Sequence, residues 1–548
     1  MNELHKSRAF LWTVFSLFTL VWLAVLGYRT LVPPDESRYA DMALAMWTSG
    51  DWVTPRLNGI IHVTDPPLQT WMNALAFGLF GAGEWQARLW TGLCGLGGIA
   101  ITGHAGCKVF GQRAGVYAAL VLASCFLWVG SGQVNSLDMG FAGMQALVLG
   151  ALLIAQRDGA SDAERRNWML VCWTAMALSL LARGPEGVLM PLAVLLAYSL
   201  AARDLRLWRR LHALKGIFIV LAIGAPWVLL AARANPGLPL GPERLVALFD
   251  PEVRRAGSWY YYFIILLPGV VPWLGVLPQS LGLGLQREAT RFRPRLMLLA
   301  WVGAIFLFLT LSTARSPGYV LPLLPAIALL TGLYFEAGER RSRVFASILT
   351  ACIGLALLIF VPFMSSDYYP GGEAELLEAY QPWVLGAGFA ALVGGAFAML
   401  HARLLRRDLT VMTLALAGFL MTELIVLGFE PYGRQRAGIP MLPAIRAELT
   451  PATRFYAVGA FEASFPYELR HKLILVAYSD DFAFGQRQEP DKLIASLDTF
   501  RAQWRADAKA GVTSLALMRA ELQAALAAEG LPMRVVARDA RRIVVANR

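Results

Sequence analysis

From residue 1 to about residue 430, the chain alternates long apolar runs with short charged clusters. Each run has about 16 to 22 residues, close to the roughly 20 that a helix needs to cross a hydrocarbon layer about 30 Å thick. The pattern predicts about thirteen transmembrane helices. The predicted spans are 9–27, 87–106, 114–131, 138–156, 167–182, 185–201, 214–232, 260–281, 296–312, 317–335, 344–363, 382–401 and 409–428.

The polar segment between the first two predicted spans, residues 33–84, contains two shorter apolar stretches. In residues 36–49 the apolar side chains recur at helical spacing, and residues 68–80 follow two prolines. Short amphipathic helices of this kind lie in the plane of the membrane surface. We therefore expect two interfacial helices in this loop.

After about residue 431 the pattern changes to short strands and helices, which is typical of a small α/β domain. The predicted strands are 455–460, 473–477, 514–518, 534–537 and 542–546, and the predicted helices are 490–509 and 519–529. We therefore divide the chain into a transmembrane domain, 1–430, with interfacial helices in its first outer loop (33–84), and a water-soluble α/β domain, 431–548.

Composition supports the membrane assignment, because 57% of the residues are hydrophobic and only 16% are charged, against about 25% charged in soluble domains. The net charge of +11 does not indicate nucleic-acid binding, since the basic residues sit in separate loops. Every second loop is basic, and the other set includes the acidic segment 367–378. The basic loops contain Lys6/Arg8, Lys108/Arg113, Arg157/Arg165/Arg166, Arg203/Arg206/Arg209/Arg210, Arg287/Arg291/Arg293/Arg295, Arg340/Arg341/Arg343 and Arg403/Arg406/Arg407.

Basic loops stay in the cytoplasm. With an odd number of spans, the N-terminus is then expected in the cytoplasm and the C-terminal domain in the periplasm of a bacterial inner-membrane protein. The five cysteines lie in apolar runs without metal-ligand spacing, so we expect buried thiols with neither disulfides nor zinc. We expect His62 at the surface.

Several charged residues fall at predicted helix ends on the outer side. They are Asp35, Glu36, Arg38, Asp65, Asp138, Arg183, Glu186 and Arg315, with Tyr319 nearby. Ionisable groups at membrane depth usually mark a functional cavity, and we expect these to share one. The alternatives are that Asp35 and Glu36 cap the interfacial helix, that Asp138 caps its span, and that Arg183 and Arg315 are snorkelling anchors.

Carboxylates combined with guanidinium groups suit a phosphate-linked substrate, because arginine pairs with phosphate bidentately and stays charged in a low dielectric. The outer side of an inner membrane lacks nucleotide sugars, so an activated donor there must be carried by a lipid. Sugar transfer from a polyprenyl phosphate is the function that these residues favour. A transporter or flippase for a lipid-linked sugar is the alternative from another class, although the charges lie toward one face and no internal repeat is visible.

The first outer loop carries a family resemblance. The runs 35–41, 49–52 and 55–59, followed by Pro66-Pro67-Leu68, Leu137-Asp138-Met139 and 318–322, resemble the bacterial lipid A aminoarabinose transferases. The tail segments 465–467, 484–485 and 488–490 are similar too. This family belongs to the GT-C superfamily and is related to protein O-mannosyltransferases. The resemblance implies a GT-C membrane fold with a periplasmic α/β tail and an undecaprenyl phosphate-sugar donor.

For the site, the resemblance implies Asp35 and Asp138 as the catalytic acids of the first and second outer loops. It matches Arg38 to a first-loop arginine and Tyr319 to the donor-side cavity. From their charge and position alone, Glu36, Asp65, Arg183 and Arg315 are also expected to bind substrate. The expected reaction is inverting transfer of 4-amino-4-deoxy-L-arabinose to lipid A, a modification linked to polymyxin resistance. A protein O-glycosyltransferase of the same superfamily is the alternative.

One position departs from the family, which usually has Glu-Lys before Pro-Pro-Leu. Here Thr64 and Asp65 stand there, so an anion replaces a cation. Some GT-C enzymes hold a divalent cation beside the acidic loop, and Asp35 and Asp138 are the residues that could hold one here, although no His/Cys spacing supports it. The expected partners are the lipid-linked donor, a glycolipid acceptor and membrane lipid, with no nucleic acid, and the protein is expected to be a monomer.

Overall fold

The structure is a computed structural model that describes residues 7–238, 258, 260–312, 315–364, 372–479 and 482–548. Contacts between Cα atoms divide the chain into two compact units. The helical unit comprises Met1–Leu26, Arg88–Tyr369 and Glu378–Gly428, and the mixed unit comprises Gly27–Ala87, Pro370–Leu377 and Phe429–Arg548. The predicted first outer loop therefore belongs to the same unit as the C-terminal α/β domain. The acidic segment 367–378 lies partly outside the described residues.

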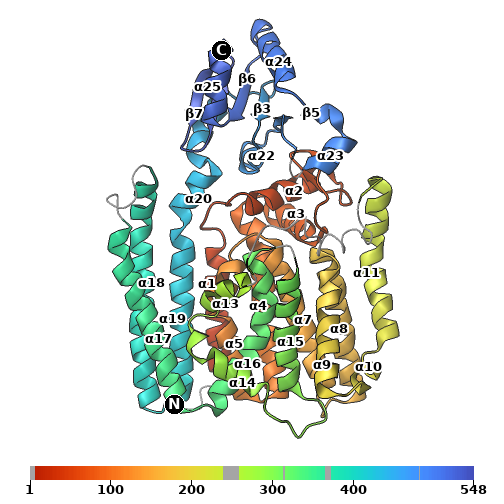
Figure 1. Ribbon diagram of the computed structural model, residues 1–548, viewed down its shortest axis with the longest axis vertical. Helices are drawn as coiled ribbons and strands as arrows, with labels where there is room; N and C mark the ends of the chain where they lie inside the picture. The colour runs from red at the N-terminus through yellow and green to blue at the C-terminus, as the bar shows by residue number, and fades with distance from the viewer. Residues whose placement is uncertain (1–6, 239–257, 259, 313–314, 365–371, 480–481) are drawn as a thin grey trace. The chain divides into compact units, whose positions relative to one another are not determined.

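The helical unit consists of helices that run alongside one another (Figure 1). Its α-helices are α1 (Arg8–Val25), α4 (Glu84–Val109, from Arg88 onward), α5 (Gln112–Leu122), α6 (Phe126–Gly132), α7 (Leu137–Gln156), α8 (Asp162–Arg183), α9 (Glu186–Ala202), α10 (Arg206–Arg209), α11 (Ala213–Ala234), α13 (Tyr261–Gly269), α14 (Leu277–Leu283), α15 (Pro294–Leu311), α16 (Leu324–Ala337), α17 (Arg340–Phe360), α18 (Gly372–Arg403, from Glu378 onward) and α19 (Arg407–Gly428). The 3₁₀-helices among the described residues of this unit are η3 (Trp273–Val276), η4 (Pro317–Leu323) and η5 (Val361–Phe363).

Each predicted span coincides with helical structure, but the predicted number of about thirteen is not confirmed. Among the described residues, seven helices are long and apolar enough to cross a membrane, or up to nine if each of two bent pairs is one span. The bent pairs are α5 with α6, at 64°, and α13 with Trp273–Leu283, at 109°. Helix α9 is apolar but only 17 residues long.

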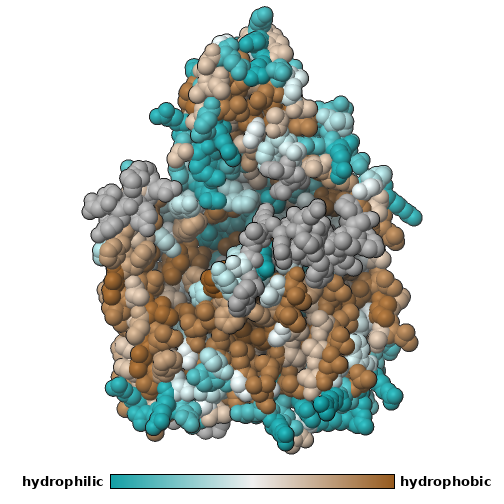
Figure 2. Space-filling view, viewed as in Figure 1, coloured by the Kyte–Doolittle hydropathy of each residue, from teal (hydrophilic) through white to brown (hydrophobic). Residues whose placement is uncertain are grey.

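The outward surface of these helices is largely apolar, as the space-filling view shows (Figure 2). On α11, for example, Leu214 and Phe218 are 88% and 71% exposed. Exposed apolar area on this scale is unstable in water and suits a lipid environment. Cys94, Cys125 and Cys172 are buried as expected, whereas Cys107 is half-buried and Cys352 is exposed, so the prediction that all five thiols are buried is wrong.

The basic loops lie together at one end of the helical unit. Lys108 approaches Glu164 within 4.0 Å, Arg113 approaches Asp408 within 3.6 Å, and the Arg291 N–H donates to Asp158 over 2.8 Å. These contacts join loops that lie far apart in the sequence. The clustering is the arrangement that the positive-inside rule anticipates.

The mixed unit begins with two short helices around a hairpin. These are α2 (Asp35–Ser49), β1 (Arg56–Leu57), β2 (Ile60–Ile61) and α3 (Leu68–Phe80), with the strands paired antiparallel. Gly50 ends α2 with a left-handed φ of 72°, and its N–H donates to the Met46 carbonyl, which is a standard helix C-cap. Both helices predicted in this loop are therefore present, and the apolar side of α2 packs on α3 and the tail through Ala43, Phe77 and Tyr467.

The tail of the mixed unit is an α/β domain with a six-stranded sheet in the order β5-β4-β3-β6-β8-β7. Strands β5, β4, β3 and β6 are parallel, and β8 and β7 are antiparallel additions. The strands are β3 (Arg454–Val458), β4 (Ile474–Val476), β5 (Leu493–Ile494), β6 (Ser514–Met518), β7 (Arg534–Arg538) and β8 (Ile543–Ala546). The helices are α20 (Glu430–Ala437), η6 (Ile439–Met441), α21 (Leu442–Glu448), α22 (Ser464–Leu469), α23 (Ala483–Gln488), η8 (Pro490–Lys492), α24 (Leu497–Lys509) and α25 (Ala520–Ala528).

The α/β prediction is confirmed. The five predicted strands are all present, as β3, β4, β6, β7 and β8. The predicted helix 490–509 is wrong in its first third, where η8 and β5 replace it, because Ser496 caps α24 by accepting from the Thr499 N–H. Tyr456, Phe500 and Trp504 form the centre of the core on one face of the sheet.

The hairpin of the first loop is fastened to the tail domain by directional contacts. The Asn58 side chain donates to the Leu473 carbonyl over 2.7 Å and accepts from the Leu473 N–H over 2.8 Å. Glu489 accepts from Arg56 over 2.8 Å and from the Ile61 N–H over 3.2 Å. Although burial alone would raise the pKa of the Glu489 carboxyl, these bonds and one from Lys492 lower it.

Candidate functional site

A charged pair stands at the end of the helical unit opposite the basic loops. Asp138 lies in the first turn of α7, after Ser136, and Arg183 is the last residue of α8, where Gly184 breaks the helix with a φ of 105°. The two side chains form an ion pair of 2.6 Å and are only 19% and 12% exposed. A pair this shielded fixes both groups in orientation, because breaking it leaves a poorly solvated charge.

Tyr319 and Gly318, both in η4, complete this cluster. The Arg183 guanidinium carbon lies 3.9 Å from the centre of the Tyr319 ring, a close cation–π contact. A Cβ on Gly318 would come within 1.9 Å of the Asp138 Oδ2. Glycine at this position is therefore what allows η4 to pack directly on the carboxylate.

Arg315 lies a few residues before η4, above aromatic rings of α13. Its guanidinium carbon is 5.4 Å from the Tyr262 ring centre and 5.9 Å from that of Tyr261. Its Nη1 is buried and has no hydrogen-bond partner among the described residues. Because an unsatisfied buried N–H is costly, this nitrogen points to an anionic ligand, whereas Arg183 is already paired.

The predicted acids of the first loop differ in their environments. Asp35 is exposed at the first position of α2, while Glu36 is 2% exposed and accepts from the Val32 N–H over 2.9 Å. Both acids complement the positive end of the helix dipole. Asp35 is accessible to a solute. Glu36 accepts from the N–H of Val32, which precedes the helix, and α2 has no side-chain cap hydrogen bond, so the capping alternative is not realised.

Asp65 and His62 lie in the segment after the hairpin. The Tyr39 hydroxyl on α2 donates to Asp65 over 3.3 Å, so Asp65 lies against the same helix as Asp35. His62 is 2% exposed and its ring centre lies 5.7 Å from that of Phe482. The expectation that His62 is a surface residue is wrong, because the tail domain covers it.

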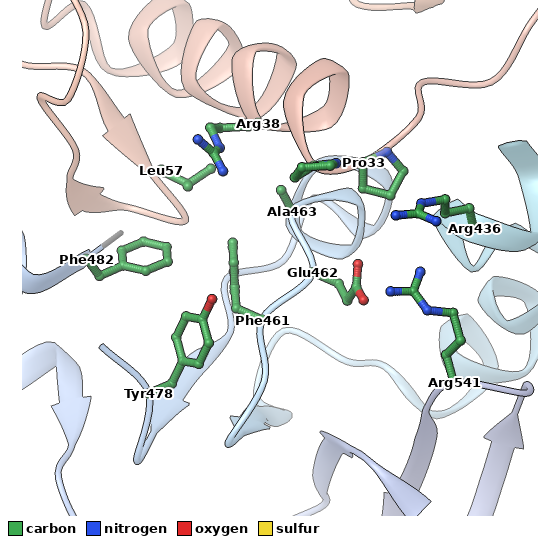
Figure 3. Close-up of a pocket in the computed structure, with 11 residues that line it drawn as sticks. Pro33, Arg38, Leu57, Arg436, Phe461, Glu462, Ala463, Tyr478, Phe482 and Arg541 are labelled. Carbon is green, nitrogen blue, oxygen red and sulfur yellow. The ribbon is translucent and has the colours of Figure 1, made fainter. Parts of the chain in front are cut away.

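Arg38 lines a pocket of about 260 Å³ within the mixed unit. Figure 3 shows Arg436 and Arg541 beside Glu462 on one side of this pocket, and Phe461, Tyr478 and Phe482 with Arg38 on the other. Three guanidinium groups and one carboxylate therefore face it, so anions are the ligands that its charge favours.

The eight predicted site residues fall into two groups. Asp138, Arg183 and Tyr319 are brought into contact in the helical unit, with Arg315 on neighbouring rings; Asp35, Glu36, Arg38 and Asp65 share the surroundings of α2 in the mixed unit. That both groups form one cavity stays a prediction. Within the described ranges, no three His, Cys, Asp or Glu side chains gather as metal ligands would.

Arg436, Arg541 and the aromatic residues of the pocket were not among the site residues predicted from the sequence. Phe461 and Tyr478 follow β3 and β4 within a few residues, and Arg541 immediately precedes Arg542 and β8. Residues that follow parallel strands gather at one edge of a sheet. These positions could therefore have been predicted as neighbours, but only if the order of the strands in the sheet had been known.

Two family models match the chain. The model for the aminoarabinose transferase C-terminal domain matches residues 441–547. The model for dolichyl-phosphate-mannose-protein mannosyltransferase matches residues 64–230. The first covers the α/β tail, and the second covers α3 and the helices that carry Asp138 and Arg183.

Named relatives and solved structures show the same likeness. An undecaprenyl phosphate-alpha-4-amino-4-deoxy-L-arabinose arabinosyl transferase from Edwardsiella ictaluri is 26% identical over 83% of this chain and 85% of its own length. The protein named arabinosyl transferase 1 of the same kind from Sodalis glossinidius is 31% identical, over 62% of this chain and 63% of its own length. The crystal structure of ArnT from Cupriavidus metallidurans bound to undecaprenyl phosphate matches at a TM-score of 0.92, with 35% identity and 99% of both chains covered.

Proposed function

The chain belongs to the family of aminoarabinose transferases of the GT-C superfamily, and we propose that it moves 4-amino-4-deoxy-L-arabinose from undecaprenyl phosphate to a phosphate of lipid A. The observation that carries this proposal is the match, over 99% of both chains, to a relative that binds undecaprenyl phosphate. The chain is an integral membrane protein, and we place its N-terminus in the cytoplasm and its C-terminal domain in the periplasm.

The donor's phosphate is held by Arg315. Its buried Nη1 lacks a partner in the described part of the chain, so an anion that arrives there satisfies a nitrogen that is otherwise costly to bury. As the bond from the anomeric carbon to the phosphate oxygen breaks, charge grows on the leaving undecaprenyl phosphate. A guanidinium fixed in a low-dielectric site stabilises that charge without reorganising.

Arg183 also stabilises the charge that grows on the leaving phosphate, and its side chain is held in one orientation. Asp138 holds it at 2.6 Å and Tyr319 lies against its plane, so Asp138 is a positioning residue for a cation. Asp138 therefore positions Arg183, whereas Asp35 acts on the acceptor.

Asp35 orients the acceptor. A phosphate acceptor is already ionised near neutral pH, so its oxygen attacks the anomeric carbon without a strong base, and the configuration inverts. Asp35 then contributes by holding the acceptor in line. With a hydroxyl acceptor, the same carboxylate would take the proton.

The test uses the full-length protein purified in detergent, where transport across a membrane is impossible. Undecaprenyl phosphate-aminoarabinose and lipid A are supplied, and mass spectrometry follows both modified lipid A and free undecaprenyl phosphate. Asp35→Asn and Arg315→Ala should each lower transfer by about 100-fold or more.

Asp491→Asn and Arg505→Ala are the matched controls, because both side chains are exposed in the mixed unit. They should leave the rate unchanged. Full activity in Asp35→Asn would refute the role of that residue, and a wild-type protein that releases no undecaprenyl phosphate in the presence of lipid A would refute the transferase.

A further inference from the structure

The tail sheet has a topological switch point between β3 and β6. The chain passes from β3 to β4 and β5 on one side and then returns to β6 on the other side of β3. In open parallel sheets, ligands bind outside the carboxyl ends of the strands at such a point. The rule depends only on the order of the strands, so it applies to the sheet of the tail domain.

The residues that follow these strands line two pockets that share a wall. One measures about 260 Å³ and the other about 650 Å³, and Phe461, Glu462, Tyr478 and Arg541 line both. Arg541 reaches this edge because Ile543 at the start of β8 pairs with Met518 at the end of β6. We call the two pockets together the switch-point crevice.

Among the described residues that line the crevice, basic side chains outnumber acidic ones. Arg542 pairs with Glu462 at 3.3 Å and with Asp539 at 2.9 Å, so the acidic side chain in the crevice is already neutralised. Within the described residues, no hydrogen bond or ion pair occupies the guanidinium of Arg436 or of Arg541. Arg38, from α2, lines the opposite side of the 260 Å³ pocket (Figure 3). Two guanidinium groups on one side offer planar pairs of N–H donors, which suit a phosphate group.

The other side of the crevice is aromatic. The ring centres of Phe461 and Phe482 lie 5.0 Å apart at nearly right angles, and Tyr478 lies 6.3 to 6.4 Å from both. Rings of this kind offer broad apolar faces beside a polar hydroxyl. A ligand that places a ring with an apolar C–H face here and an anion near Arg436 satisfies both sides, and a phosphorylated sugar offers both groups.

We propose that the switch-point crevice binds a phosphorylated sugar of the acceptor's headgroup, with its phosphate on Arg436 and Arg541 and its ring against Phe461 and Tyr478 (Figure 3). The inference rests on the proposed function, because it takes the acceptor to be a phosphorylated glycolipid. Asp35 lies one helical turn before Arg38 on α2, so the mixed unit contributes both the acceptor's anion site and the carboxylate that orients it.

The test compares Arg436→Gln/Arg541→Gln with Arg505→Gln/Arg538→Gln. Both double variants remove two charges from the same unit, and Arg505 and Arg538 are exposed residues outside the crevice. The KM for lipid A should rise at least tenfold in the first variant only, with the KM for the donor unchanged.

Binding without donor separates this inference from the proposed function. Full-length protein in nanodiscs is titrated with lipid A carrying both phosphates, with dephosphorylated lipid A, and with inorganic phosphate. The crevice predicts tight binding of the first, at least tenfold weaker binding of the second, and weak binding of inorganic phosphate. The crevice variant should lose the preference for phosphorylated lipid A.

Equal affinity of the crevice variant and the wild type for phosphorylated lipid A would overturn the inference even if transfer proceeds. Inorganic phosphate that binds as tightly as lipid A would also overturn it, since the sugar would then contribute nothing. Conversely, wild-type protein that binds lipid A through these arginines but transfers no sugar to it would refute the proposed function and leave the crevice standing.

Discussion

At the scale of single residues, Gly318 determines how closely η4 approaches the Asp138–Arg183 pair. A methyl group there would overlap the Asp138 carboxylate at 1.9 Å, so the carboxylate must turn away and release Arg183. Gly318→Ala should therefore lower transfer by roughly tenfold or more, as the loss of an electrostatic positioning contact does.

The control is Gly303→Ala on α15, because a Cβ at Gly303 meets no atom within 4 Å. Initial rates of aminoarabinose transfer and thermal unfolding are measured for both variants in detergent. A Gly318→Ala protein with the wild-type rate would show that the close packing on Asp138 has no catalytic consequence.

Residue type and position were enough to single out Asp138 and Arg183, because charged groups at apolar helix ends are conspicuous in a sequence, and the family resemblance added Tyr319. The pairing was not predictable from sequence: Arg183 was expected to bind substrate, whereas its guanidinium lies 2.6 Å from the Asp138 carboxylate. Gly318 escaped notice as a site residue because a glycine leaves no chemical signal until its neighbours are known.

At the scale of elements, α2 and the hairpin β1–β2 are joined through Asp41. This carboxylate is 7% exposed and accepts from the Asn58 N–H over 2.7 Å. Burial raises its pKa from 3.8 to about 6, against the lowering effect of the Asn58 bond and of Arg470 and Lys472. The folded state thus binds this proton more tightly than the unfolded state.

The stabilising effect of that proton is fully present below pH 3.8 and is lost as the pH rises through about 6. Asparagine keeps an acceptor for the Asn58 N–H but cannot ionise. The melting temperature of Asp41→Asn relative to wild type should therefore increase between pH 4 and pH 7.5, as differential scanning fluorimetry can measure. The difference should stay flat for the exposed control Asp491→Asn, and a flat profile for Asp41→Asn would contradict the raised pKa.

The helical spacing of apolar residues predicted α2, and an apolar stretch after two prolines predicted α3. The tail strands were predictable as short apolar runs, since β6 and β8 are buried along their whole length. The two-residue strand β5 was missed, since it is too short for any period. The bends within 112–132 and 261–283 were missed as well, because continuous apolar runs give no sign of where a helix breaks.

At the scale of the whole molecule, the alternation of basic loops makes the two sides of the membrane distinguishable. Alkaline phosphatase fused after Arg548 should be active and a green fluorescent protein fused there should be dark, as expected for a periplasmic end. A fluorescent protein inserted between Gly338 and Arg340 should fluoresce. A fluorescent C-terminal fusion would require an even number of spans and would contradict the proposed orientation.

The bonds between Asn58 and Leu473 join residues 415 positions apart. In the proposed orientation, the first loop is exported long before residues 429–548 are made, so it has no docking surface until translation is nearly finished. Exchanging only the tail between two members of the family would then separate each hairpin from the surface that fits it. A chimera should therefore be active only when residues 27–87 and 429–548 come from the same parent protein. These two distant segments are expected to evolve together.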